Sequence, residues 1–155
     1  MTNVTVRACT AHDLAVLEAR EVRPGSGFAR SNLALAEAGR LHFIAAFTED
    51  DVAGFVLLDT DEVNELRPEM QSLWVYPTYR RQGIGEMLTA SIEAIAREQG
   101  FDEVFLGVNP DNPAAIPMYI GLAYKPTGDH RFVTDEVTGV EQHEAIYRKS
   151  LRTGR

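Results

Sequence analysis

The hydrophobic pattern changes its period around residue 80 of this 155-residue chain. A mostly apolar run over residues 70–76 predicts a β-strand, and a basic, glycine-bearing turn follows it. Apolar residues then recur at positions 84, 87, 88, 92, 95 and 96, with the spacing of a helix that packs one face on a sheet. We therefore expect a strand, a turn and a long helix over roughly residues 84–99.

Shorter apolar or alternating runs, bounded by turn residues, predict the other strands. Thr10 followed by Asp13 resembles a capped helix start, and Gly39 is expected to end a second helix. Two strands flanking the acidic turn 48–51 predict a hairpin. The remaining expected strands are residues 4–7, 41–47, 52–58, 103–108, 131–133 and 143–149, and the remaining helices begin after residue 10, span 31–38 and begin at residue 112.

Length and composition limit the domain organisation. The chain is long enough for one domain with a core and short for two, so we expect one domain over residues 1–155. No run approaches the roughly 20 apolar residues of a membrane span, which predicts a cytoplasmic protein with no membrane partner. Cys9 is the only cysteine and the histidines lack metal-motif spacing, so neither a disulfide nor a metal site is expected.

The charge balance bears on partners. With 23 acidic and 15 basic side chains, the formal net charge is −8. A negative surface disfavours nucleic acid and anionic membranes, and it fits a cationic small molecule or a peptide amine better. The same charge could serve solubility alone, and that interpretation stays open.

The turn after Arg80 carries the most specific chemistry. The first N–H groups of the following helix have no intrahelical partners, and with the positive end of the helix dipole they attract phosphate. Gly83 and Gly85 would let a ligand reach the backbone, while Arg80 and Arg81 supply positive charge. The turn lacks the Gly-Lys-Ser/Thr of a nucleotide loop and the third glycine of a dinucleotide turn, so another phosphate ligand is expected.

Two motifs support a family resemblance. Arg80-x-x-Gly83-x-Gly85 resembles motif A of the GNAT superfamily of acyl-CoA-dependent N-acyltransferases, where this loop holds the pyrophosphate of coenzyme A. A second match lies further along the chain. It is the run Asn112-x-x-Ala115-x-x-Met118-Tyr119, followed by Ala123-Tyr124, which resembles motif B of the same superfamily. The resemblance covers nearly the whole chain. It implies an α/β (α+β) fold with a mixed six- or seven-stranded sheet, about four helices, and parallel strands four and five that splay apart around the acyl-pantetheine arm.

The same resemblance implies the cofactor and its contacts. Acetyl-CoA would be the co-substrate, and a primary amine of a small molecule or peptide would be acetylated by direct transfer in a ternary complex. Trp74 and Val75 would lend main-chain hydrogen bonds to the pantetheine arm. Asn112 would contact that arm, cap its helix, or do both. The implied cofactor-binding residues are Trp74, Val75, Arg80, Arg81, Gln82, Gly83, Ile84, Gly85, Glu86 and Asn112.

Acyl transfer to an amine needs a neutral amine, a donor for the oxyanion and a proton for the departing thiolate. By resemblance, Tyr119 is the candidate acid, with a core tyrosine as the alternative. Glu69 is the candidate base, acting through a water, provided that burial raises its basicity. Ordered water with backbone carbonyls, or His130, could replace it. The Val75 amide is the candidate oxyanion donor, and Cys9 is expected to be an inert buried thiol.

Two positions depart from the family pattern. Pro117 falls inside the helix expected after Asn112, so that helix must kink or start late, which could shift Tyr119. Ala123 stands where the family usually has glycine, while Gly121 comes two residues earlier, so the helix is expected to end early. Neither departure touches the phosphate turn.

The acceptor is the least specified part. By resemblance its pocket would be built from residues 18–40 and 125–144. A homodimer is an analogy-based expectation. A non-catalytic acyl-CoA sensor and a phosphate-ligand enzyme unrelated to coenzyme A remain as alternatives. Side chains that could meet an acceptor carboxylate are Arg20, Arg23 and Arg30, and those that could meet an amine are Glu21, Asp129, Asp135, Glu136 and Glu141, although a solvated surface explains most of them.

Overall fold

A computed structural model describes residues 3–135 and 138–152. In these ranges the strands form one seven-stranded sheet in the order β1-β2-β3-β4-β5-β7-β6, in which only β4 and β5 are parallel. The mixed α/β fold implied by the family resemblance is confirmed. The strands are β1 (Thr5–Ala8), β2 (Leu41–Phe47), β3 (Val52–Asp59), β4 (Glu69–Val75), β5 (Glu103–Val108), β6 (Lys125–Thr134) and β7 (Glu141–Ser150).

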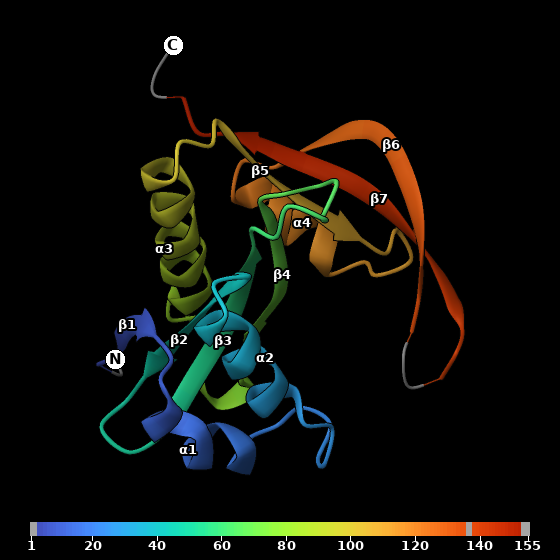
Figure 1. Cartoon of the computed structure of the whole chain (residues 1–155). Coiled ribbons are helices and arrows are strands. Elements are labelled where there is room, and N and C mark those ends of the chain that lie inside the picture. The colour runs from blue at the N-terminus through green and yellow to red at the C-terminus, as the bar shows by residue number, and fades with distance from the viewer. Residues whose placement is uncertain (1–2, 136–137, 153–155) are drawn as a thin grey trace.

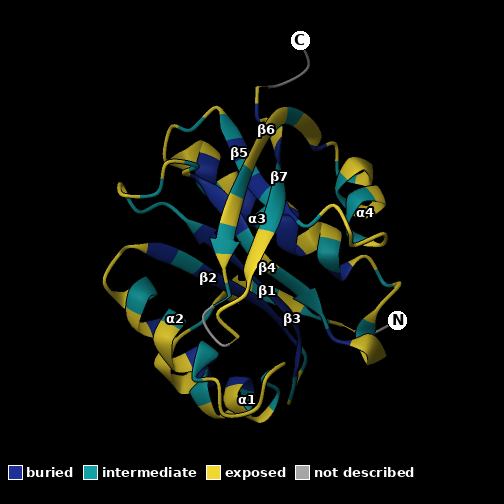
Figure 2. Ribbon diagram, turned by 90° about the vertical axis from the view of Figure 1, so that its right-hand side faces the viewer, coloured by how far each residue is buried: buried dark blue, intermediate teal, exposed yellow. Residues whose placement is uncertain are grey.

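Helices cover both faces of the sheet (Figure 1). The first face carries α1 (Leu14–Ala19) and α2 (Phe28–Glu37), whose apolar side chains pack with an aromatic-rich cluster from β2 and β3. The second face carries α3 (Ile84–Glu98) and α4 (Ala115–Gly121), which pack with a second cluster. Figure 2 shows the buried positions concentrated in the central strands between these helices.

The long helix α3 follows from its apolar stripe. Ile84, Leu88, Ile92 and Ala96 are all buried against the sheet, and Leu88 and Ile92 are completely so. Fully burying a leucine or isoleucine side chain contributes about 1.5–3 kcal/mol. Packing therefore holds α3 in place, and the helix predicted over residues 84–99 is confirmed.

Strands β4 and β5 diverge soon after they meet. Their ladder contains the single pair Glu69 and Phe105, so the strands part beyond it. A bulge in β4 lies just past this point: Gln71 pairs with Leu57 and Trp74 with Phe55, which leaves two β4 residues opposite one β3 residue. The first of the two, Ser72, has a φ of 56°. The splay expected between strands four and five is thus present, with a bulge at its edge.

Several predicted boundaries were wrong. The helix expected over residues 31–38 begins earlier, at Phe28. Gly27 adopts a φ of 74°, Ser26 Oγ accepts a hydrogen bond from the Phe28 amide, and the Glu21 carboxylate accepts one from the Ala29 amide. The closing strands expected over 131–133 and 143–149 are also longer, because β6 pairs with β7 at residues 125–126 and 130–134 in a long hairpin, orange and red in Figure 1.

The end of α4 carries backbone strain. Ala123 has a φ of 74°, and the Tyr124 amide donates to the Tyr119 carbonyl across it, as in a Schellman cap. A left-handed conformation costs a residue with a side chain about 1–2 kcal/mol, whereas glycine loses about 0.5–1 kcal/mol more in backbone entropy on folding. We expect Ala123→Gly to raise the free energy of unfolding by about 0.5–1 kcal/mol, measured by urea denaturation.

Ala90 provides the matched control, because it lies exposed within α3. The same change there, Ala90→Gly, should lower the free energy of unfolding by about 1 kcal/mol. Equal destabilisation by both changes would contradict the strain assigned to Ala123.

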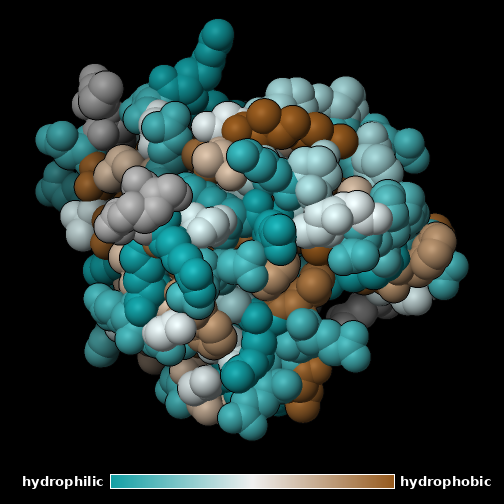
Figure 3. All heavy atoms as spheres, turned by 90° about the horizontal axis from the view of Figure 1, so that it is seen from above, coloured by the Kyte–Doolittle hydropathy of each residue, from teal (hydrophilic) through white to brown (hydrophobic). Residues whose placement is uncertain are grey.

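The face of the molecule seen in Figure 3 is mainly hydrophilic, with hydrophobic side chains gathered in a few patches. Within the described ranges, none of the helices is long and apolar enough to span a membrane.

Candidate active site

The phosphate turn opens α3 without a side-chain cap. Gly83 occupies the N-cap position with a φ of 77°, and Arg81 has a φ of 65°. Among the residues that the structure describes, no side chain caps the helix start, so its first N–H groups are left without intrahelical partners as the sequence pattern predicts. The left-handed φ of Gly83 explains why glycine is needed there, since a side chain would be strained.

Gly85 is needed for a different reason. A Cβ built on Gly85 would meet only Val75 Cγ2, at an ordinary van der Waals distance of 3.8 Å. Neither the fold nor the backbone angle therefore demands glycine at this position. Its missing side chain instead leaves the first turn of α3 open to a ligand such as pyrophosphate, which fits the chemistry of the exposed N–H groups.

The two arginines of the turn are arranged differently. Arg80 Nε donates a hydrogen bond of 2.8 Å to the Val75 carbonyl, and its guanidinium lies 4.8 Å from the centre of the Trp74 ring. Arg80 is thus held against the end of β4. Arg81 is exposed beside the helix start, where its charge can meet an anion.

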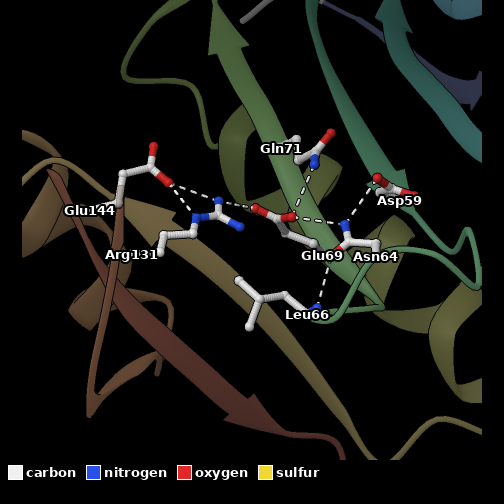
Figure 4. Close-up of polar contacts among 7 residues, drawn as sticks. All are labelled: Asp59, Asn64, Leu66, Glu69, Gln71, Arg131 and Glu144. Atoms are coloured by element: carbon white, nitrogen blue, oxygen red, sulfur yellow. Dashed lines mark hydrogen bonds and ion pairs between the residues drawn. The ribbon is translucent and has the colours of Figure 1, made fainter. Parts of the chain in front are cut away.

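Glu69 is buried at the start of β4, with 3 % of its surface exposed. Its Oε1 accepts hydrogen bonds of 3.0 Å from Asn64 Nδ2 and from Gln71 Nε2, and its Oε2 forms an ion pair with Arg131 (Figure 4). This candidate base is therefore buried, with the Arg131 cation beside it. The carboxylate is also firmly held, because both oxygens have partners.

Arg131 on β6 joins two carboxylates. It pairs with Glu69 on β4 and with Glu144 on β7, where its Nε and Nη2 both lie 2.8 Å from Oε1 (Figure 4). The side chains cross β5 at Gly107, where a Cβ would stand 2.3 Å from Glu144 Oε1 and 2.7 Å from Arg131 Nη2. Glycine at position 107 therefore makes room for this bridge.

Tyr119 lies on the face of the sheet that carries α3 and α4. It is partly buried on α4 and packs against the cluster beneath α3, with its ring 6.4 Å from that of Tyr124. Burial, and secondly the negative charge of Glu144, raises the pKa of Tyr119 above its ordinary value. The phenol therefore keeps its proton at neutral pH, as an acid must before it donates.

The helix α4 starts late, which resolves the conflict with Pro117. The helix begins at Ala115, so Pro117 lies in its first turn, where the missing N–H costs no intrahelical bond. Asn112 precedes the helix, and its Oδ1 accepts hydrogen bonds from the amides of Ala114 and Ala115. Asn112 thus satisfies the amides at the helix start, although Ala114 holds the N-cap position.

A cavity of about 520 Å³ lies on the α1–α2 side of β4. Both sequence regions expected for an acceptor pocket contribute to it, the first through eight residues between Glu21 and Asn32 and the second through Asp135. Ser72 to Trp74 line it from β4. Arg23 and Asp135 form an ion pair of 3.2 Å at its rim. Of the other candidate acceptor contacts, Glu21 lines the cavity, Arg20, Arg30, Asp129 and Glu141 do not, and Glu136 lies outside the described residues.

Two further candidate groups are Cys9, which follows β1, and His130 on β6. Burial raises the pKa of Cys9 to about 12, so this thiol stays protonated and is a poor nucleophile. His130 is exposed on β6, where its Nδ1 lies 2.7 Å from Nε2 of His143. In the described part of the chain, no group of three or more metal-ligating side chains is suitably placed for a metal ion.

Sequence reasoning missed Arg131, Glu144 and Gly107. No motif marks them, and they come together only because β7 lies between β5 and β6. The one available signal was the presence of charged residues along β6 and β7. A solvated surface explains such charges equally well.

In this fold one parallel pair of strands, β4 and β5, diverges, and β4 leads through an uncapped glycine turn into the long helix α3. Together these features define an acyltransferase class of fold. The chain belongs to the acetyltransferase (GNAT) family, whose sequence profile matches residues 10–123. It is 32 % identical to human N-acetyltransferase 8 over 101 residues, which cover 63 % of this chain and 44 % of that protein. The chain thus spans under half the length of this relative.

Solved structures share the fold. An N-acetyltransferase from Staphylococcus aureus Mu50 superimposes with a TM-score of 0.75 at 16 % identity, over 97 % of this chain and all of that one. The PaiA N-acetyltransferase from Thermoplasma acidophilum, solved in complex with coenzyme A, gives a TM-score of 0.69 at 20 % identity, over 96 % and 99 % of the two chains.

Proposed function

We propose that this protein transfers an acetyl group from acetyl-CoA to a primary amine of a small molecule or peptide, directly, in a ternary complex. The observation that carries the proposal is the pairing of an open, uncapped turn at Gly83–Gly85 with the divergence of β4 and β5. A helix start of this kind suits the pyrophosphate, and the opening suits the acyl arm. The coenzyme A complex of PaiA supports the same cofactor.

The cofactor contacts divide between two elements. The amides of Gly83, Ile84, Gly85 and Glu86, with Gln82 and the charge of Arg81, hold the pyrophosphate. Arg80 supplies charge from the end of β4, where it is held against Trp74. The main chains of Trp74 and Val75 bind the pantetheine arm from β4, and Asn112 binds it from the start of α4.

Glu69 and Tyr119 divide the proton transfers. Glu69 takes a proton from the amine through a water, and its place where β4 and β5 begin to part supports that role. The Val75 amide stabilises the charge that develops on the carbonyl oxygen. Tyr119 donates its retained proton to the departing thiolate. The protonated state of the Cys9 thiol supports direct transfer without an acyl-enzyme step.

We further propose that the chain acts in the cytoplasm as one acetyltransferase domain, alone or as a homodimer. The isolated cysteine supports an intracellular location. The net charge of −8 supports a cationic amine as the acceptor.

Turnover of acetyl-CoA against a panel of primary amines tests the proposal, with the released thiol measured by a colorimetric reagent and the amide by mass spectrometry. We expect at least one amine to release thiol and form amide in equal amounts. Binding of acetyl-CoA without release for any amine would instead favour the acyl-CoA sensor. Binding of ATP or NAD in place of coenzyme A would favour an enzyme unrelated to coenzyme A.

A further inference from the structure

The hydrogen bonds around Arg131 leave one carboxylate oxygen unused. Both oxygens of Glu69 are engaged, Oε1 with two amide side chains and Oε2 with Arg131. Glu144 directs only Oε1 at the guanidinium. Within residues 3–135 and 138–152, no hydrogen bond engages its Oε2.

The charges of this group are unbalanced. Two carboxylates, Glu69 and Glu144, share one guanidinium, so the formal charges of the three side chains sum to −1. The Glu144 side chain is only 19 % exposed, so solvent would screen a cation beside its unused oxygen less than at an open surface. A ligand carrying one positive charge would restore the balance.

The position of Glu144 places that oxygen near the reaction. Its side chain lies over Gly107 of β5, the strand that borders the opening, and its charge acts on the Tyr119 hydroxyl. The cavity reaches β4 at Ser72, and the preceding residue, Gln71, donates to Glu69. Neither carboxylate lines the cavity, so an amine whose body occupies it reaches them only by extending its nitrogen past Gln71.

We propose that Glu144 is a specificity-determining residue that binds the acceptor as an ammonium ion through Oε2, while Arg131 and Glu69 hold its carboxylate in place. This rests on the proposed acetyl transfer. The acceptor class is then an alkyl primary amine, which is a cation at neutral pH, in preference to an arylamine, which is neutral.

The test compares Glu144→Gln with the wild type on benzylamine, which is a cation at neutral pH, and on aniline, which is neutral. We expect the KM for benzylamine to rise about 10- to 100-fold, the loss expected of a charge-assisted contact, with little change in kcat. The KM for aniline should not change. Glu144→Asp should recover part of the affinity, and Glu141→Gln, on an exposed position of the same strand, should behave as the wild type.

Calorimetric titration of benzylamine into protein saturated with coenzyme A keeps this test separate from catalysis. If the wild type releases no thiol, the proposed function fails, but a weaker titration of Glu144→Gln would still support ammonium binding. An unchanged benzylamine affinity, or equal losses for benzylamine and aniline, would overturn the role assigned to Glu144. Thermal unfolding of each variant establishes that it is folded.

Discussion

Gly85→Leu is expected to abolish coenzyme A binding and leave the fold intact. A Cβ at this position meets no atom closer than 3.8 Å, so the added side chain fills ligand space rather than core space. Leucine also favours a helix over glycine by about 0.8 kcal/mol, so the free energy of unfolding should stay level or rise. Calorimetric titration with coenzyme A and urea denaturation measure the two effects.

Gly85→Ala and Ala90→Leu are the matched controls. One methyl group should weaken binding only in part, and leucine at exposed Ala90, further along α3, should leave binding unchanged. If Gly85→Leu binds coenzyme A as the wild type does, the first turn of α3 is not the pyrophosphate site. A loss of both binding and stability would mean that the side chain disturbs the helix itself.

The local patterns in the sequence predicted most of the elements. The stripe that includes Leu88 and Ile92, the nearly continuous apolar runs of β2 and β3, and the alternating burial of β5 follow from the hydrophobic pattern. The start of α2 was wrong because its stabilising contact comes from Glu21, a side chain beyond the helix. The full length of β6 was missed because pairing with β7, rather than its own composition, makes it a strand.

The candidate site shows the same division between local features and contacts that only the fold creates. The glycine turn is a local feature whose chemistry follows from a short stretch of chain, so it could be predicted residue by residue. The Glu69–Arg131–Glu144 bridge depends on strand order and on the register that places Arg131 opposite Glu144. Without the fold, Glu69 could be placed at the start of a strand, but neither its ion pair nor the unused oxygen of Glu144 could be foreseen.

The second large effect is expected from Tyr119→Phe. The ring would keep its packing near Tyr124, while the hydroxyl that supplies the proton is lost. We expect kcat to fall by about 10²- to 10⁴-fold, the usual contribution of a positioned acid, with the affinity for acetyl-CoA nearly unchanged. Steady-state kinetics and calorimetric titration measure these quantities.

Tyr147→Phe is the control for this change, since it removes a hydroxyl from a buried tyrosine on β7 to which no catalytic role is assigned. Because the pKa of Tyr119 is raised, the wild-type rate should show no loss from its ionisation below its ordinary pKa of about 10. A wild-type kcat for Tyr119→Phe would remove this residue from the mechanism. The thiolate would then leave with a proton from solvent, and the contribution of α4 would reduce to binding the pantetheine arm through Asn112.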